Sequence, residues 1–432
     1  MQSKSMLISD LPVDQAAMRR RNFVAGLWHG TFLALGVSFT QPATVISAFV
    51  ADLTGSTVWV GGLITILSIA GAMPQLFVAR WIEPRPLKMP YLLTAIYLRV
   101  FSWGALAWLI FAIGDQHPMT LAWILVGMLV IFYAGGGLGN IPYTDIIGKI
   151  IPTDRRGTFF GGIGALAGPL SVGAALAAQR ILAQVNYPNS YALLFGLAAI
   201  ALIIASLGFW VIREPSGSVV MHDLQPWHQY WKQLLAASRR MKELIITQLL
   251  TGFSLMALPF YVVFARDLLD APLEAVGWFL LAQVIGGLLS NLVWARLVDK
   301  SGSRRMIFYC AVLSALTPLL AIAMSRWGWL ALLPVFFLVG AIMNGRSVGF
   351  QSALLELAPA PERSTYAALN AVLTIPIAFL SLIGGLLLRE FSYYALFIAA
   401  AVFIATGAVI ARRWTLQEQE KDALGSEALP DH

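Results

Sequence analysis

The chain has 432 residues, of which 58% are hydrophobic and 12% are charged, and its formal net charge is +7. A soluble domain carries about 25% charged residues, so this composition excludes an ordinary soluble enzyme and indicates a membrane protein. The single cysteine, Cys310, excludes an intramolecular disulfide. The excess of basic residues is also typical of proteins that bind nucleic acid. The positions of these residues along the chain decide between a membrane protein and a nucleic acid-binding protein.

Apolar stretches long enough to cross a bilayer recur along almost the whole chain. The first stretch follows three consecutive arginines at 19–21 and is longer than the core of a signal peptide. We therefore expect it to remain uncleaved, with the N-terminus in the cytoplasm. The sequence predicts an all-α membrane protein with twelve transmembrane helices, at residues 23–49, 57–79, 89–113, 119–144, 157–182, 190–212, 243–265, 273–295, 305–325, 329–355, 364–388 and 392–411.

The positions of the lysines and arginines support this topology. Of the 29, the predicted spans place 23 on the cytoplasmic side, 4 outside and 2 within spans, as the positive-inside rule requires. Because these residues are spread over membrane-flanking loops and do not form one basic face, we expect no nucleic acid partner. The short loops are typical of a bacterial inner (cytoplasmic) membrane protein, here with both termini cytoplasmic.

The longest polar insert lies between the sixth and seventh predicted spans. Its apolar residues have the spacing of an amphipathic helix on the membrane surface: Trp227, Tyr230, Trp231, Leu234 and Leu235. The expected parts of the chain are a cytoplasmic N-terminal segment (1–22), an N-terminal six-helix bundle (23–212), a cytoplasmic linker with this helix (213–242), a C-terminal six-helix bundle (243–412) and a polar, disordered cytoplasmic tail (413–432).

The two predicted bundles resemble each other. A shift of 207 residues superimposes Pro152, Arg156, Thr158 and Pro169 on Pro359, Arg363, Thr365 and Pro376. Proline within a helix and arginine at its cytoplasmic end are uncommon, so their joint recurrence indicates an internal repeat. Two pseudo-symmetric bundles in the same orientation are typical of a transporter with a site between its halves.

The loop at residues 295–305, between predicted spans eight and nine, reads ARLVDKSGSRR. It resembles the signature loop of the major facilitator superfamily, G-x-L-a-D-[RK]-x-G-[RK]-[RK], and the resemblance extends over about residues 23–412. It implies the fold of that superfamily and a cytoplasmic latch whose salt bridges break when the cavity opens inward. In such a latch the acid lies at a helix N-terminus, Gly302 permits a tight turn, and the basic pair faces an acid at the end of span ten. The residues concerned are Asp299, Arg304, Arg305 and Glu356.

The equivalent loop in the first half matches the signature poorly. Glu83 replaces the Asp, Pro86 stands where the Gly should be, and Lys149 occupies the position that corresponds to Glu356. These departures predict different salt bridges in the first half. The further candidates for gating or coupling are Glu83, Asp145 and Arg363.

Predicted span five resembles the antiporter motif of the same superfamily, G-x6-G-x3-G-P-x2-G-G. Gly164, Gly168, Pro169 and Gly173 fit this motif, while Val172 replaces one Gly. Small residues let neighbouring helices approach closely. In the superfamily this motif accompanies proton-coupled export, so the resemblance implies efflux.

In this fold the first, fourth, seventh and tenth helices line the central cavity, and each carries polar residues on one face. Ionisable residues inside a span are costly and are functional candidates. Arg346 could bind an anionic group or pair with a carboxylate. Arg99, in span three, could form a structural ion pair or have a role in transport. His29 could titrate near neutral pH or hydrogen-bond to the backbone. The expected cavity residues are His29, Tyr133, Asn140, Thr144, Gln248, Thr251, Ser254, Asn344, Arg346, Ser347 and Gln351.

The leading function is secondary active transport of a small organic solute by alternating access, as proton-coupled efflux. No acid occurs within predicted spans one and seven, so Asp145, Glu356 or His29 would carry the proton. One alternative is uptake of an organic anion or other nutrient. The other is a non-transporting membrane assembly factor with the same fold.

The sequence contains no nucleotide-binding loop, metal cluster or convergent catalytic set. We therefore expect no enzymatic activity, no cofactor and no metal. The expected partners are a small-molecule substrate, protons and the lipid bilayer, and the protein is expected to be a monomer.

Overall fold

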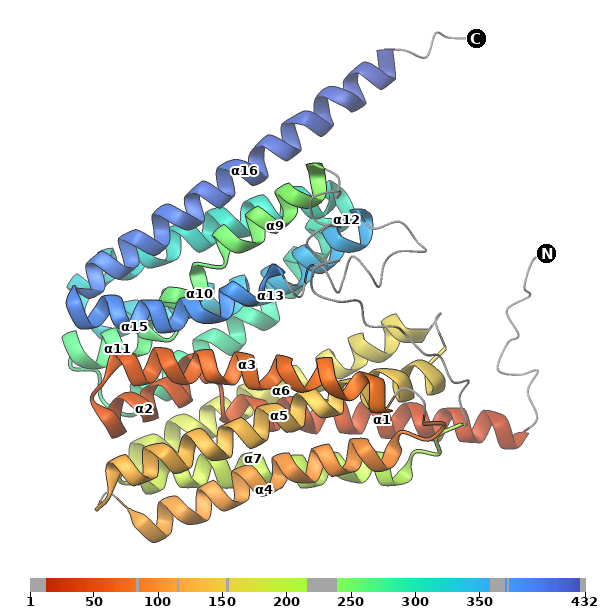
Figure 1. The fold of residues 1–432 in the computed structure, drawn as a ribbon, viewed down its shortest axis with the longest axis vertical. Helices are drawn as coiled ribbons and strands as arrows, with labels where there is room; N and C mark the ends of the chain where they lie inside the picture. Colours follow the sequence, from red (N-terminus) through yellow and green to blue (C-terminus); the bar gives the residue numbers. More distant parts are fainter. Residues whose placement is uncertain are drawn as a thin grey trace. The chain divides into compact units, whose positions relative to one another are not determined.

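The computed structural model describes residues 13–82, 85–114, 116–152, 155–215, 239–357, 370 and 373–427 (Figure 1). Within these ranges the chain is helical and contains no strand, as expected where lipid cannot satisfy backbone polar groups. Ten stretches are long and apolar enough to cross a membrane. The predicted all-α membrane fold is confirmed.

The elements are α1 (Val13–Phe39), η2 (Pro42–Ile46), α2 (Ser47–Thr54), α3 (Thr57–Ile82), α4 (Met89–Ile113), α5 (Pro118–Ile150), α6 (Arg156–Gln184), α7 (Asn189–Val211), α9 (Arg239–Thr251), α10 (Ser254–Ala257), α11 (Phe260–Leu268), α12 (Ala275–Met324), η4 (Ser325–Trp327), η5 (Trp329–Leu332), α13 (Leu333–Leu357), η7 (Ile375–Phe379), α15 (Leu380–Glu390) and α16 (Tyr393–Glu427).

One of the ten stretches, Ala275–Trp327, contains two of the predicted spans. The backbone of α12 leaves the helical conformation at Gly302, where φ is 78° and ψ is 162°. A positive φ is readily adopted only by glycine, so the turn predicted between spans eight and nine is present. The span predicted at 364–388 lies partly outside the described residues, and the number twelve stays a prediction.

Two other expectations concern the polar segments. The amphipathic helix expected in the linker lies outside the described residues. The tail was expected to be disordered, but α16 continues as a helix to Glu427. This expectation was wrong for residues 414–427, because glutamate, glutamine, lysine and alanine, which are common there, are all good helix formers.

The described residues form two compact units. The first comprises residues 13–41 and 66–215, and the second comprises 42–65 together with the described residues from 239 onward. The short segment 42–65 was expected in the N-terminal bundle, and its place in the second unit was not predicted.

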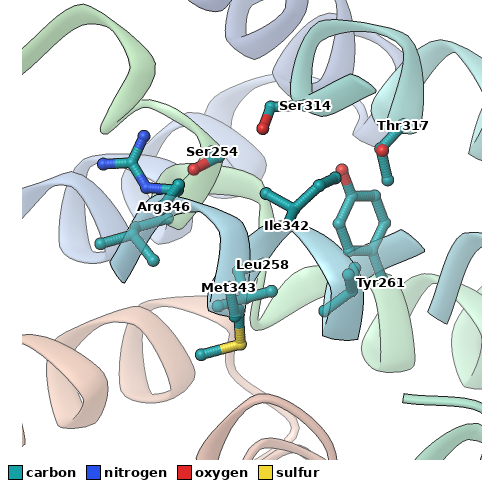
Figure 2. A pocket seen from close by; sticks show the side chains of 10 residues that line it. Ser254, Leu258, Tyr261, Ser314, Thr317, Ile342, Met343 and Arg346 are labelled. Atoms are coloured by element: carbon teal, nitrogen blue, oxygen red, sulfur yellow. The ribbon is translucent and has the colours of Figure 1, made fainter. Parts of the chain in front are cut away.

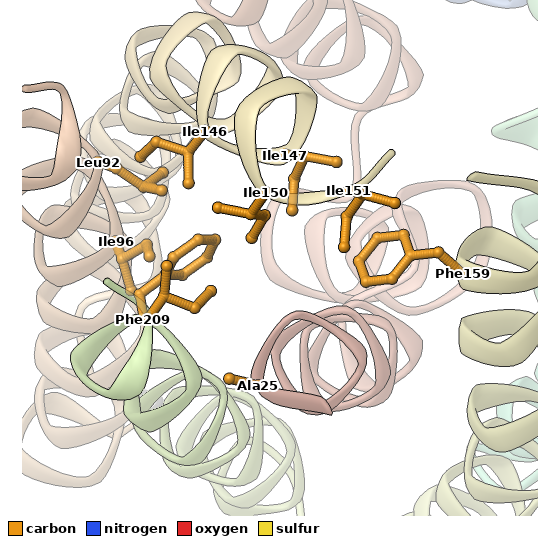
Figure 3. Close-up of a cluster of buried hydrophobic side chains, with 10 residues drawn as sticks. Ala25, Leu92, Ile96, Ile146, Ile147, Ile150, Ile151, Phe159 and Phe209 are labelled. Atoms are coloured by element: carbon orange, nitrogen blue, oxygen red, sulfur yellow. The ribbon is translucent and has the colours of Figure 1, made fainter. Parts of the chain in front are cut away.

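The core of the first unit is built from apolar residues of five helices (Figure 3). Four isoleucines at the end of α5 recur at a spacing that points all of them to one side, and they pack against residues of α1, α4, α6 and α7. The buried cluster comprises Ala25, Leu92, Ile96, Ile146, Ile147, Ile150, Ile151, Phe159, Phe209 and Ile212.

In the second unit, glycines bring α12 and α13 into close contact. A Cβ atom on Gly286 would overlap the carbonyl oxygen of Phe337, and one on Gly340 would overlap the carbonyl oxygen of Gln283. Small residues allow this backbone approach between membrane helices. The approach fixes the rotation of α13 against α12, and with it the direction of the polar side chains of α13.

The segment 42–65 is joined to the rest of the second unit by polar contacts. Arg266 of α11 donates to Asp52 Oδ1 from Nη2 and Nε, at 2.7 and 3.0 Å. The Thr57 hydroxyl donates to the carbonyl oxygen of Gly385 at 3.1 Å, and Thr65 Oγ1 accepts the backbone N–H of Leu382 at 3.2 Å. These bonds explain why α2 and the start of α3 belong to the second unit.

The α12–α13 contact can be tested by adding one methyl group. Because the atom that a new Cβ would meet belongs to the backbone, Gly340→Ala should destabilise the protein by about 1–3 kcal/mol and lower its melting temperature in detergent. The matched control is Gly127→Ala on α5, where a Cβ meets no described atom within 4 Å. Similar melting temperatures for the two variants would contradict the packing described above.

Candidate functional site

The candidate site lies where predicted span seven is interrupted. The segment consists of α9, α10 and α11, with breaks at Gly252–Phe253 and at Leu258–Pro259. Proline lacks an N–H group, so a regular hydrogen-bond ladder cannot continue through Pro259. Interrupted helices are where membrane transporters commonly bind solutes.

Arg346 of α13 faces this interruption and borders three cavities in the second unit. The first cavity, of about 110 Å³, is shown in Figure 2. The second is small, about 10 Å³, and the third has about 380 Å³. The residues around the first are Ser254, Leu255, Leu258, Tyr261, Ser314, Thr317, Val339, Ile342, Met343 and Arg346. Those around the third are Gln248, Arg346, Ser347, Phe350, Gln351, Leu354 and Asn370.

Several buried polar atoms around these cavities have no hydrogen-bond partner among the described residues. They are Arg346 Nη1, Ser254 Oγ, Gln248 Oε1 and Asn370 Oδ1. The guanidinium carbon of Arg346 lies 5.3 Å from the ring centroid of Phe350, a favourable but non-hydrogen-bonding contact. Burying an unpaired polar atom costs about 1–3 kcal/mol. These four atoms can therefore bind a ligand that supplies the missing hydrogen-bond partners.

Most of the cavity residues predicted on the second unit lie around Arg346. Gln248, Ser347 and Gln351 line the largest cavity, Ser254 the first and Thr251 the small one. Asn344 Nδ2 donates to the carbonyl oxygen of Gly287 at 2.8 Å; Asn344 is not among the described residues that line these three cavities, and its place in the central cavity stays a prediction. The Asn344 amide joins α13 to α12, because the glycines of α12 bring a backbone carbonyl within reach.

Sequence reasoning missed the apolar lining of these cavities and four residues with a hydroxyl or amide group. Tyr261, Ser314 and Thr317 line the first cavity and Asn370 the third. Ser314 and Thr317 belong to predicted span nine, which was not expected to line a site. Their i, i+3 spacing in an otherwise apolar stretch is the signal that could have found them.

In the first unit, Arg99 is accommodated by aromatic and glycine residues of α5. Its guanidinium carbon lies 4.4 Å from the ring centroid of Phe132, and its Cγ lies 3.0 Å from where a Cβ on Gly135 would be. Arg99 Nε has no hydrogen-bond partner among the described residues. The glycine run of α5 therefore provides space for the arginine of α4.

The other predicted cavity residues of the first unit are placed as follows. His29 is 3% exposed, its Nδ1 lies 3.0 Å from the carbonyl oxygen of Ala205, and its ring packs against Phe209. His29 therefore joins α1 to α7 through the backbone bond that was one of its two expected roles, and its place in the cavity stays a prediction. Tyr133 is half-buried and Asn140 exposed, and the Thr144 hydroxyl donates to the carbonyl oxygen of Asn140 at 2.7 Å.

A charge network near the cytoplasmic ends predicted for α4 and α5 replaces the latch in the first unit. Asp145 lies 3.1 Å from Lys88 Nζ and 2.7 Å from Lys149 Nζ, and Lys149 also contacts Glu214 at 2.9 Å. The Glu214 carboxylate, 3% exposed, also accepts the backbone N–H groups of Lys88 and Met89. The different salt bridges predicted from Lys149 are present, but sequence reasoning missed Glu214 as their acid.

The loop between predicted spans eight and nine is held by a serine. The buried Ser303 hydroxyl donates to Glu356 Oε2 at 2.6 Å. Ser303 follows the turn at Gly302 directly, and the expected pairing of Arg304 and Arg305 with Glu356 stays a prediction. Asp299 is exposed. Glu83 and Arg363, the remaining gating candidates, lie outside the described residues.

The glycines of the antiporter-like motif lie on α6 together with Pro169. Gly168 is buried. A Cβ on Gly164 or Gly173 would meet no described atom within 4 Å, and the close helix packing expected there stays a prediction. Both positions are exposed in the structure.

Residues 244–429 match the family model of the Major Facilitator Superfamily, and solved structures with the same fold cover nearly the whole chain. The family match covers the C-terminal part of the chain, and the ten apolar stretches of the described residues are long enough for a multi-pass membrane protein. A search of curated proteins found no match.

Three solved structures of transporters are similar to this chain. A bacterial homologue of the iron transporter ferroportin in the inward-facing state has a TM-score of 0.69 and 15% identity, over 94% of this chain and 100% of the other. The nucleoside transporter NupG gives 0.65 and 14%, over 92% and 99%. A POT family transporter in complex with 5-aminolevulinic acid gives 0.67 and 12%, over 92% and 96%. At these identities the likeness shows the fold alone.

The charge network of the first unit can be tested at Glu214. Glu214→Gln removes the charge that pairs with Lys149, so we expect a loss of about 1.5–3 kcal/mol and a lower melting temperature in detergent. The matched control is Glu390→Gln, because Glu390 pairs with Arg389 at 3.5 Å while 68% exposed and exposed pairs contribute little. An unchanged melting temperature of Glu214→Gln would remove Glu214 from the network.

Proposed function

We propose that this chain is a secondary active transporter whose small organic solute binds at Arg346. The single observation that carries this proposal is the half-buried Arg346, whose Nη1 atom is buried and has no partner among the described residues, next to an interrupted helix and three cavities. A cation inside a span is costly, and a solute that pairs with it recovers part of that cost. Alternating access would move the loaded site from one side of the membrane to the other.

For direction and coupling, we propose export coupled to protons, which rests on the motif of α6. His29 and Asp145 are both engaged within the first unit. Glu356 has an exposed side chain bonded to Ser303, and we propose it as the proton-carrying group.

Uptake of an organic anion is the second candidate, and Arg346 itself favours it. A buried guanidinium selects a negatively charged group over a neutral or positive one. The similar POT family structure holds 5-aminolevulinic acid, which contains a carboxylate. Export and uptake share the same binding chemistry and differ in which side loads the site.

A comparison of cells tests transport without a known substrate. Cells that overproduce the wild type, Arg346→Gln or Arg326→Gln are analysed by untargeted mass spectrometry of cytosol and medium. Arg326 is the matched control, because it is exposed in the short helix η4 outside the site. We expect at least one solute whose ratio between medium and cytosol changes when the wild type or Arg326→Gln is overproduced. In Arg346→Gln this change should be at least about tenfold smaller.

The sign of the change separates the candidates. A solute enriched in the medium indicates export, and one enriched in the cytosol indicates uptake. A protonophore should abolish the export that we propose, and unchanged export would contradict proton coupling. Equal solute distributions for wild type, Arg346→Gln and empty vector would contradict transport and favour the non-transporting assembly factor.

A further inference from the structure

The cavity of about 110 Å³ is mostly apolar and lies directly next to Arg346 (Figure 2). Five aliphatic or thioether side chains from α10–α11 and α13 border it, and Figure 2 shows Ile342 between Arg346 and Tyr261. Such a lining favours an apolar group of the ligand. At about 10–15 Å³ for each water-sized group, the volume of about 110 Å³ holds roughly 7–11 such groups, which is ample room for a chain of four carbon atoms. The five are Leu255, Leu258, Val339, Ile342 and Met343.

The largest of the three cavities, which Arg346 also borders, has a mixed lining. Its polar residues are Gln248, Arg346, Ser347, Gln351 and Asn370, and its apolar residues are Phe350 and Leu354. Two of its amide oxygens, Gln248 Oε1 and Asn370 Oδ1, are buried without a partner among the described residues. An amide oxygen accepts a hydrogen bond, so these two atoms fit a hydroxyl group on the ligand.

The charges around the cavities indicate a single negative charge on the ligand. Among the described residues that line the three cavities, Arg346 is the one charged residue. A second anionic group on the ligand would enter the cavities without a cation to pair with, which is unfavourable in a low-dielectric site. The planar guanidinium matches the two oxygens of a carboxylate, and the unpartnered Ser254 hydroxyl can donate to it.

From this juxtaposition we infer that the site binds a short-chain hydroxymonocarboxylate. Its carboxylate pairs with Arg346 and Ser254, its hydroxyl group donates to Gln248 or Asn370, and its alkyl chain occupies the apolar cavity. This inference rests on the proposed function and names the class of its solute.

Binding of four matched probes to the purified full-length protein in detergent tests the inference by isothermal titration. The reference probe is 2-hydroxyhexanoate. In 1,2-hexanediol the carboxylate is replaced by a neutral group, in hexanoate the hydroxyl is absent, and in 2-hydroxybutanedioate the chain ends in a second carboxylate. We expect 2-hydroxyhexanoate to bind tightest, and the diol about tenfold or more weaker. Each methylene removed from the chain should weaken binding about fourfold.

Two pairs of variants connect binding to the cavities. Arg346→Gln should weaken binding of 2-hydroxyhexanoate about tenfold or more, and Arg326→Gln should leave it unchanged. Leu258→Ala widens the apolar cavity and should shift the preference toward 2-hydroxyoctanoate. The matched control Leu268→Ala should not shift it, because Leu268 lies at the end of α11 outside the three cavities and is 50% exposed.

The outcomes distinguish the two proposals. Tighter binding of the diol or of the dianion overturns the hydroxymonocarboxylate class, as does an unchanged chain-length preference in Leu258→Ala. Transport is judged separately, by the distribution of cellular solutes: a cationic or neutral solute that moves leaves transport standing and overturns the substrate class. If Arg346→Gln does not fold, the binding of the four probes to the wild type still tests the hydroxymonocarboxylate class.

Discussion

A guanidinium group inside a membrane-spanning helix must be solvated by something other than lipid. Insertion of an arginine near the centre of a span costs about 2.5–3.5 kcal/mol, and Arg346 lies in a mostly apolar span whose nearby polar residues include Asn344 and Ser347. In the second unit the interrupted span seven brings Ser254 to this guanidinium, while Gln248 and Asn370 contribute amide groups. The close approach of α12 and α13 at Gly286 and Gly340 then sets how α13 presents the arginine. The site thus depends on one charge and on the backbone contacts that orient it.

The first unit solves the same problem differently. Arg99 is covered by the ring of Phe132 and by the glycine run of α5, so much of its stabilisation comes from packing and a cation–π contact. No cavity of the kind around Arg346 is described there. Its acids are instead used in the network of Lys88, Asp145, Lys149 and Glu214. The two buried arginines therefore serve different purposes, and Arg346 is the better candidate for contact with a solute.

The fold class and much of the site in the second unit could be predicted from the sequence. Both depend on residue type and on how deep a residue lies within a predicted span. Long apolar stretches require helices, Gly302 marks a turn, and a charge in such a stretch marks Arg346 directly. Gln248 and Ser254 followed from the polar face of the same predicted span. These inferences need no knowledge of which helices are neighbours.

What could not be predicted depends on rotation and on distant partners. Asn344 and Arg346 are two residues apart on one helix, so their side chains point to nearly opposite sides. The packing of α13 against α12 then determines that Asn344 meets the carbonyl oxygen of Gly287 while Arg346 borders the cavities. Glu214 lies 65 residues beyond Lys149, with which it pairs. Ser303 of α12 and Glu356 of α13 are 53 residues apart in the sequence. Nothing in the spacing of these residues indicates such contacts. The same holds for segment 42–65, which the Asp52–Arg266 pair draws into the second unit.

The most direct test of the central claim, that Arg346 holds the anionic group of a solute, is an experimental structure with 6-bromo-2-hydroxyhexanoate and anomalous diffraction from bromine. We predict a bromine peak in the cavity bordered by Leu258 and Thr317, with the carboxylate within hydrogen-bond distance of the Arg346 guanidinium. A bromine peak elsewhere, with Arg346 paired to a carboxylate of the protein itself, would contradict that claim.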